Sequence, residues 1–309
     1  EPEAATDVFA TVTRTGTNSS ATVTGVGFPF DTMISRTRAN AGAGAFFDRI
    51  RGPLLVLLPN STETEASRAG TVTSFDQDGF STAADAENLV NANNYTYAYQ
   101  FLKRAKGFFD VVAYSGNATA GRTVPHSLSV APELLIVRRR SASEDWTVYN
   151  STFGASYFLN LNASDAVGGT ASIWNNTAPT SSVFSLGAHS RVNSSGHTYI
   201  AYLFATLDGI SKVGSYTGNG SSQTISCGFS AGSRFILIKR TDASGDWYIW
   251  DSVRGIVAGN DPRLSINSTS SEVTNDDSVD PHNSGFIVNQ VSATNINVSS
   301  GTYIFYAIA

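Results

Sequence analysis

The sequence predicts an all-β protein made of three tandem, homologous, β-sandwich-like modules of about 100 residues each. Only 15% of the 309 residues are charged, and Gly, Ser, Thr and Asn alternate with residues that favour strands. The central stretch from Ser233 to Gly255 has two earlier counterparts, because Ile34, Ile136 and Ile238 stand 102 residues apart within ISRTR, IVRRR and IKRTD. Glycines separated by 102 and 101 residues close the three copies: Gly52, Gly154 and Gly255.

Three copies imply three modules, preceded by a short polar arm rich in alanine. The connections Lys103 to Gly107 and Leu207 to Ser211 are short, so neighbouring modules are held close together. We expect these boundaries: arm 1–8 and β modules 9–106, 107–208 and 209–309.

The central strand of the third module is apolar on both faces. Phe235 and Leu237 point to one side, and Ile236 and Ile238 point to the other, because side chains alternate along a strand. Each Ile, Leu or Phe kept from water contributes roughly 1.5 to 3 kcal/mol. We therefore expect a closed packing of the modules around a pseudo-threefold axis, rather than an extended string.

The elements follow the same order in each module. ATVTRTG, DVVAYSG and KVGSYTG each predict a strand that enters a turn. A second strand ends in GF, SL or GF, and the central strand is followed by a polar turn and an aromatic returning strand. An Asn-Ser/Thr turn, a strand around DGF, SVF or SGF, and a final strand complete the module. These last strands, YTYAYQF, TYIAYLF and TYIFYAI, align Tyr99, Tyr202 and Tyr306. Only Thr82 to Val90 favours a helix.

Two aromatic positions precede the closing glycine. Five residues before it, every module has a ring, so we expect a shared core position: Phe47, Tyr149 and Trp250. Eight residues before it the residue varies from Gly44 to Trp146 and Trp247, so the fold does not require it. Trp146 and Trp247, with Trp174 and Tyr248, could form stacking platforms for sugar rings. The alternative is that these rings cap a sheet or pack between modules.

Charged residues recur beside the same glycine. Asp48 and Arg51 share the spacing Asp-x-x-Arg-Gly with Asp251 and Arg254, whereas the second module has Asn150 and Phe153 (NSTFG). We expect an ion pair that ties a turn. Because we expect it to be partly exposed, its contribution is at most about 1 kcal/mol.

Composition excludes several classes of partner. The net charge of -5 gives no basic field for a phosphate backbone, and Arg138 to Arg140 are too short a cluster to change this. No apolar run approaches the roughly 20 residues of a membrane helix.

The lone Cys227 excludes an intrachain disulfide. The chain begins Glu1-Pro2 without a methionine, and we expect a processed product or part of a longer chain.

Catalytic and metal signatures are weak. The four histidines have no partner at ligand spacing, so we expect no metal and no cofactor. Carboxylates such as Glu144 with Asp145, or Asp242 with Asp246, fall in hairpin turns where solvated acids are ordinary. Asp76 to Gly79 resembles part of a calcium loop, but a tight turn is the better interpretation. We expect no catalytic residues.

Motifs along the chain resemble a family of uncharacterised domains in virion structural and tail proteins of bacteriophages, marine phages especially. The resemblance covers Phe9 to Ala309, and its motifs include FFDRIRG, LKRAKGFFDVVAYSGN, VPHSLSVAPELLIVRRR, SSVFSLG, YIAYLFA, ISKVGSYTGNG, RFILIKRTDASGDW and GTYIFYAIA. It implies a particle component assembled in the cytoplasm of a host bacterium. It supplies no functional residues.

These observations lead to three functional hypotheses. The first is a non-enzymatic, multi-copy virion structural protein of the tail or fibre, which contacts other virion proteins and a host cell-surface glycan through an adhesion or assembly role. The second is a capsid decoration (cement) protein at threefold or quasi-threefold positions. The third is a tail-associated glycan depolymerase. Copy number per particle separates the first two.

Overall fold

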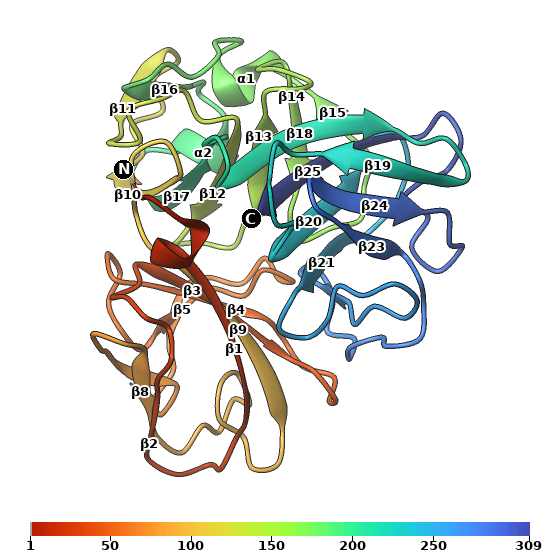
Figure 1. Ribbon diagram of the computed structural model, residues 1–309. Helices are drawn as coiled ribbons and strands as arrows, with labels where there is room; N and C mark the ends of the chain where they lie inside the picture. The colour runs from red at the N-terminus through yellow and green to blue at the C-terminus, as the bar shows by residue number, and fades with distance from the viewer. Residues whose placement is uncertain (1) are drawn as a thin grey trace.

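The computed structural model describes residues 2–309, and it is an all-β molecule, as predicted. Antiparallel sheets gather in three lobes (Figure 1), which we name lobe 1 (9–106), lobe 2 (107–208) and lobe 3 (209–309). Among the described residues, the helices have at most four residues, so none is long enough to cross a membrane.

Each lobe begins with a long strand and ends with one. The strands of lobe 1 are β1 (Phe9–Thr15), β2 (Ala21–Val23), β3 (Thr32–Thr37), β4 (Ala45–Asp48), β5 (Leu55–Val56), β6 (Ala66–Ser67), β7 (Val72–Phe75), β8 (Phe80–Thr82) and β9 (Thr96–Leu102). The elements of lobe 2 are β10 (Phe109–Ser115), β11 (Arg122–Pro125), β12 (Leu134–Arg139), β13 (Thr147–Asn150), β14 (Tyr157–Asn160), β15 (Gly168–Gly169), α1 (Ala171–Trp174), β16 (Val183–Leu186), α2 (Ser190–Asn193) and β17 (Thr198–Phe204). The strands of lobe 3 are β18 (Ser211–Thr217), β19 (Ser222–Ser226), β20 (Phe235–Arg240), β21 (Trp247–Asp251), β22 (Leu264–Ser265), β23 (Val279–His282), β24 (Gly285–Asn289) and β25 (Thr302–Ile308).

The main sheets of the lobes share one strand order. Lobe 1 has β1-β9-β3-β4, lobe 2 begins β10-β17-β12-β13 and lobe 3 begins β18-β25-β20-β21, so the last strand of each lobe lies between its first and third. A smaller sheet stands opposite each main sheet: β2-β8-β7, β11-β16 and β19-β24-β23. An apolar core fills the space between the two sheets in each lobe, so the lobes are sandwich-like.

A fourth apolar core lies between the lobes. The central strands are apolar on both faces, and in lobe 3 Ile236 and Ile238 pack inside the lobe while Phe235 and Leu237 pack in the common core. This two-sided burial confirms the alternation that the sequence predicted. The common core contains residues of all three lobes around an apolar cavity of about 30 Å³, which Ile34, Ile136 and Leu237 line.

Strand register changes one predicted alignment. Ile34 faces Gln100 and Ile136 faces Tyr202, and the residue in the same place of lobe 3 is Leu237, opposite Tyr306. Ile238, which we had aligned with Ile34, is therefore one residue out of register. In the last strand of lobe 1, the residue that corresponds to Tyr202 and Tyr306 is likewise Gln100 and not Tyr99. The glycine spacing is consistent with this shift, because Gly154 and Gly255 are 101 residues apart whereas Ile136 and Ile238 are 102 residues apart.

The predicted ring position lies inside each sandwich. Phe47, Tyr149 and Trp250 are buried, each in the core of its own lobe. The closing glycines Gly52, Gly154 and Gly255 have φ values of 96°, 77° and 126°, a region that side chains rarely adopt. These turns therefore require glycine.

The first turn of each lobe, at which the sequence predicted a glycine, is held by that glycine together with an asparagine and a tyrosine that we did not predict. A Cβ at Gly16, Gly116 or Gly218 would lie 2.1 to 2.2 Å from a backbone carbonyl oxygen, so only glycine fits there. A buried asparagine accepts the backbone N–H that follows each of these glycines, and these asparagines are Asn91, Asn193 and Asn297. The residue after each asparagine donates its backbone N–H to a tyrosine hydroxyl, and this tyrosine is the second residue of the strand that follows: Tyr97, Tyr199 and Tyr303.

Two predicted local features differ in the structure. Thr82 ends β8, and residues 83–90 form turns and bends rather than a helix, because the buried Asp85 carboxylate accepts the backbone N–H groups of Glu87, Val90 and Asn91. In the arm, Ala5–Asp7 form a 3-10 helix, and both Ala5 and Val8 are buried in the common core.

Candidate functional site

The contacts between lobes run in one direction around the molecule. A buried cation lies near the end of the central strand of each lobe: Arg36, Arg138 and Lys239. Arg36 donates to the carbonyl of Gly42 in its own lobe at 2.6 Å and to that of Ser270 in lobe 3 at 2.9 Å. Arg138 donates to its own Glu144 carbonyl and to that of Glu63 in lobe 1. Lys239 donates to its own Gly245 carbonyl at 2.8 Å and to that of Ser164 in lobe 2 at 3.0 Å.

Backbone hydrogen bonds repeat this cycle. Gly42 N–H donates to Thr269 of lobe 3 at 2.8 Å, and Glu144 N–H donates to Thr62 of lobe 1 at 3.1 Å. Gly245 N–H donates to Ser164 of lobe 2 at 2.9 Å. The hairpin that leaves each central strand is therefore clamped to a loop of the preceding lobe.

Lys239 is the one cation of this set that changes charge near neutral pH. Burial lowers the pKa of its amine to about 8 from 10.5, whereas burial lowers the pKa of Arg36 and Arg138 only to about 10. Below pH 8 the folded and unfolded chains both hold the Lys239 proton. Between pH 8 and 10.5 only the unfolded chain holds it, so raising the pH stabilises the folded state.

We expect deprotonation of Lys239 to raise the free energy of unfolding by up to about 3 kcal/mol between about pH 8 and pH 10. The window ends there because tyrosines of the unfolded chain ionise near pH 10. Urea denaturation at several pH values measures this slope. The matched control is Lys239→Arg, which introduces the residue type of the other two lobes and keeps its proton over most of this range, because burial lowers the pKa of those arginines only to about 10. Equal slopes for the two proteins would contradict the assignment.

The tryptophans predicted as sugar platforms are buried. Trp146, Trp247 and Trp174 are 0%, 1% and 2% exposed, and Tyr248 is 8% exposed. Trp146 donates its indole N–H to Leu58 of lobe 1, and Trp247 donates to Asn160 of lobe 2, both at 2.9 Å. This placement contradicts the platform interpretation, because a stacking face must be open to solvent, and it agrees with the alternative of packing between modules.

Trp174 and Tyr248 lie away from these interfaces. Trp174 packs in the core of lobe 2, where its indole N–H donates to the carbonyl of Tyr157 at 3.1 Å. Tyr248 packs in the core of lobe 3 and lies under the guanidinium of Arg263, whose central carbon is 5.0 Å from the ring centroid. Neither ring offers a free face.

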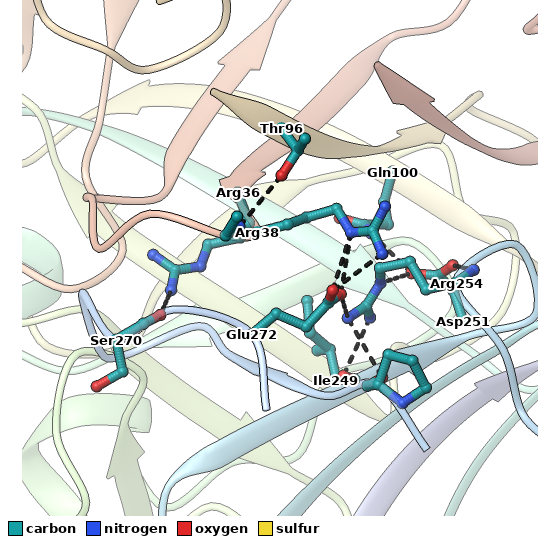
Figure 2. Close-up of polar contacts among 11 residues, drawn as sticks. Arg36, Arg38, Thr96, Gln100, Ile249, Asp251, Arg254, Ser270 and Glu272 are labelled. Carbon is teal, nitrogen blue, oxygen red and sulfur yellow. Dashed lines mark hydrogen bonds and ion pairs between the residues drawn. The ribbon is translucent and has the colours of Figure 1, made fainter. Parts of the chain in front are cut away.

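An ionic network joins lobe 1 to lobe 3 (Figure 2). Glu272 of lobe 3 lies between Arg38 of lobe 1, at 2.9 Å, and Arg254, at 3.1 Å. Arg254 also bonds Asp251 at 2.5 Å, and Gln100 of lobe 1 donates to the same carboxylate at 3.2 Å. The side chains of Asp251 and Arg254 are fully buried, so the predicted ion pair forms but is not partly exposed as we expected.

An equivalent network of other residues joins lobe 2 to lobe 1. Glu65 of lobe 1 lies 2.8 Å from Arg140 of lobe 2 and 3.1 Å from Arg51. Arg51 bonds Asp48 at 2.5 Å, and the hydroxyl of Tyr202 from lobe 2 donates to that carboxylate at 2.8 Å. Arg140, which the sequence placed in a simple basic cluster, is thus committed to a contact between lobes.

The third interface, between lobes 3 and 2, departs from this pattern. The residues that correspond to Arg140, Glu65 and Arg51 are Thr241, Val167 and Phe153. Val167 N–H donates to the Thr241 carbonyl at 2.9 Å, as Glu65 does to Arg140, so the backbones still meet. Among the residues that the structure describes, no ion pair joins lobe 2 to lobe 3.

Loss of the charged side chains leaves a cleft at this third interface. The cleft has a volume of about 570 Å³ and lies between residues 152–167 of lobe 2 and the β18–β25 edge of lobe 3. Phe153, Val167 and Ile304 give it an apolar surface, and both Phe153 and Val167 are only partly buried. We take this cleft as the candidate functional site, because it is where one interface has diverged from its two counterparts.

The carboxylates considered for catalysis are engaged in local contacts. Glu144 pairs with Arg139, and Asp145 pairs with Arg191 at 2.9 Å. Asp246 accepts from the Asn267 amide at 2.8 Å. Asp242 is held by Arg240 through two contacts of 3.0 Å, and this pairing lowers the pKa of its carboxyl group.

The segment that resembled a calcium loop is a turn between β7 and β8. Asp76 N–H donates to Gly79 O at 2.8 Å, and the Asp78 carboxylate accepts the N–H groups of Gly27 and Gly25 at 2.6 and 3.1 Å. Those backbone hydrogen bonds lower the pKa of Asp78. Over residues 2–309, no group of three or more His, Cys, Asp or Glu side chains is placed to hold a metal ion.

Sequence reasoning found the residues of the ionic networks only in part. The Asp-x-x-Arg spacing identified Asp48 with Arg51 and Asp251 with Arg254, and the change at Asn150 and Phe153 was visible. The accompanying changes at Val167 and Thr241 were missed, although the register of the repeat places them opposite Glu65 and Arg140. The cleft itself required the distances between lobes.

Comparisons with known proteins give a family and no function. Residues 4–309 match a family described as a domain of unknown function (DUF7483). No curated protein and no solved structure matches the chain.

Proposed function

The chain belongs to the DUF7483 family, whose function is unknown, and from that starting point we propose that it is a non-enzymatic structural protein of a bacteriophage virion. It acts at the tail or fibre as an adhesion or assembly module. The proposal includes its architecture, in which three copies of one β unit pack around a pseudo-threefold axis within a single chain.

One observation carries the architectural part. Arg36, Arg138 and Lys239 hold their own hairpin and the loop of the preceding lobe, so lobe 1 contacts lobe 3, lobe 2 contacts lobe 1 and lobe 3 contacts lobe 2. Three equivalent contacts that close on themselves are what a threefold arrangement requires. The shared strand order and the common apolar core support the same arrangement.

The structural role is supported by how the interior charges are used. The buried Asp48, Arg51, Asp251 and Arg254 serve contacts within and between lobes. Such networks fix the relative positions of the lobes. The charged groups in them are already engaged in ion pairs and hydrogen bonds, so they are not available to bind a substrate. A rigid body of this kind suits a particle component, and the resemblance of the sequence to phage virion domains supports that setting.

A second candidate is a capsid decoration protein. A chain with internal pseudo-threefold packing fits a threefold or quasi-threefold position of a shell, because it can offer three similar faces to three subunits. The two settings differ in stoichiometry, since a shell carries many more such positions than a tail.

The third hypothesis, a glycan depolymerase, has less support. Its candidate acids are tied to Arg139, Arg191, Arg240 and Asn267. The test is incubation with host surface polysaccharide, followed by a search for shortened chains; release of fragments would favour this activity over the structural role.

The location of the chain in intact particles tests the main proposal. Quantitative mass spectrometry of purified particles gives copies per particle, and antibody labelling in electron micrographs gives the position. We expect a low copy number at the tail. A high copy number over the shell supports decoration, and absence from particles overturns the virion role.

A further inference from the structure

We propose that the cleft between lobes 2 and 3 binds a neutral saccharide, with one sugar ring placed against Phe153. This inference rests on the proposed adhesion role and names its ligand class and its site. This site does not involve the four aromatic residues that the sequence suggested as sugar platforms, because the rings of Trp146, Trp174, Trp247 and Tyr248 are buried.

The cleft lies where three side chains differ from their counterparts at the other two interfaces. At the other two interfaces an arginine of one lobe, and a glutamate and an arginine of the preceding lobe, occupy the corresponding space; the second arginine is fully buried and the first is 21% to 27% exposed. At this interface Thr241, Val167 and Phe153 are shorter or uncharged, and the backbone contact between Val167 and Thr241 is kept. The space therefore opens without loss of the lobe packing.

The surface of the cleft combines an apolar wall with hydroxyl groups. Phe153 and Val167, both partly exposed, provide the apolar area, which suits the C–H face of a sugar ring. Ser215 and Thr217 lie opposite Ile304 and Thr302 in the β18–β25 pairing, so their hydroxyl groups stand on the same side of the sheet. Both are exposed, and they can exchange hydrogen bonds with sugar hydroxyls.

One fixed carboxylate lies at the rim. Asp242 is held by Arg240 on one side and accepts the Thr302 N–H at 3.0 Å, while its side chain remains 36% exposed. A carboxylate oriented in this way accepts hydrogen bonds from vicinal hydroxyls. The corresponding residues of lobes 2 and 1 are Ser141 and Ala39, so only this interface carries the acid.

Charge selects among ligands. The residues that line the cleft include Asp242 and no Lys or Arg, and the nearby Arg240 is already paired with Asp242, so a phosphate or an acidic sugar meets no unpaired cation there. A volume of about 570 Å³ lies within the range of small-molecule sites and accommodates one or two sugar rings. Neutral hexoses and N-acetylhexosamines are the class that fits.

The experiment measures binding of four probes to the full chain by saturation-transfer NMR: the methyl glycosides of glucose, galactose, mannose and N-acetylglucosamine. We expect at least one to bind wild type. Two variants should abolish that binding. V167E/T241R rebuilds the ion pair of the lobe 1–lobe 2 interface inside the cleft, and Ser215→Phe fills the cleft from its exposed opposite wall. Phe153→Ala should weaken binding by about tenfold or more, through loss of apolar contact.

The matched control is Ala113→Phe. Ala113 occupies in β10 the place of Ser215 in β18, since each faces the third residue of the last strand, and it is equally exposed but lies at a different interface. Its binding should equal that of wild type. Because Ser215 is on the surface, its variant keeps the test decisive even if V167E/T241R fails to fold.

Two results would overturn the proposal: no probe binds wild type, or both cleft-filling variants bind like wild type. Failure here is separable from failure of the virion role. A chain found on the tail that binds none of the four sugars keeps the structural role and loses the saccharide site. A chain that binds sugar in the cleft but is absent from particles keeps the site and loses the virion role.

Discussion

Asp48→Ala is expected to lower the free energy of unfolding by about 3 to 5 kcal/mol. The carboxylate accepts the Arg51 N–H at 2.9 Å, the Arg51 side chain at 2.5 Å and the Tyr202 hydroxyl at 2.8 Å. Its removal leaves the guanidinium of Arg51 buried with Glu65 as its remaining counter-charge, and leaves the Tyr202 hydroxyl without its acceptor. Chemical denaturation measures the loss.

The chain contains its own matched control for this substitution. At the corresponding positions lobe 2 has Asn150 and Phe153, so Asp48→Asn combined with Arg51→Phe removes the buried cation together with its partner. We expect this double variant to lose less stability than Asp48→Ala, because no buried charge remains uncompensated.

An exposed ion pair provides the second comparison. Glu87→Ala breaks a contact with Arg68 in which the glutamate is 47% exposed, and it should cost less than about 1 kcal/mol. If Asp48→Ala were as mild as Glu87→Ala, the interlobe network would not stabilise the protein as we infer.

Trp247→Ala is expected to cost about 3 to 5 kcal/mol, through lost apolar burial and the cavity left behind. Trp247 is 1% exposed in the common core, and its indole N–H bonds Asn160 of lobe 2 at 2.9 Å. The variant therefore weakens both the core and the contact between lobes 3 and 2. Its thermal and urea unfolding should still follow one transition, because the lobes share the common core.

The control is Tyr157→Ala, a large aromatic side chain that is 45% exposed. Its change in stability should stay within about 0.5 kcal/mol, as for most surface substitutions. Equal losses for Trp247→Ala and Tyr157→Ala would show that the ring of Trp247 does not join the lobes. A shift of Trp247→Ala to several separate transitions would argue against one shared core.

The strands could be predicted because their causes are local. Alternation of apolar residues places Ile236 and Leu237 on opposite faces whatever surrounds the sheet, and a strongly positive φ favours glycine, as at Gly52 with a φ of 96°. Burial of Phe47, Tyr149 and Trp250 followed from a ring being present in every copy. The one-residue error at Ile238 arose because identical residue types were matched, whereas backbone register aligns Leu237.

The fate of the polar and aromatic residues could not be predicted in the same way. Arg138 reads as a solvated cation at a strand end, but its guanidinium reaches a carbonyl 75 residues earlier in the chain. Trp146 reads as an optional exposed ring, but lobe 1 covers it and accepts its N–H. In both residues the partner belongs to another lobe, and no local pattern encodes that proximity.

By itself the sequence determined the all-β class, the order of strands along each copy, the two-faced apolar strands and the pairing of Asp48 with Arg51. Only the tertiary structure decided which charges are buried, which tryptophans are covered and where a cleft stays open. The physical reason is that strand alternation and turn conformation depend on neighbouring residues, whereas burial and the filling of an interface depend on side chains contributed from two lobes. The replacement of Arg140 and Glu65 by Thr241 and Val167 becomes an opening only where those two surfaces meet.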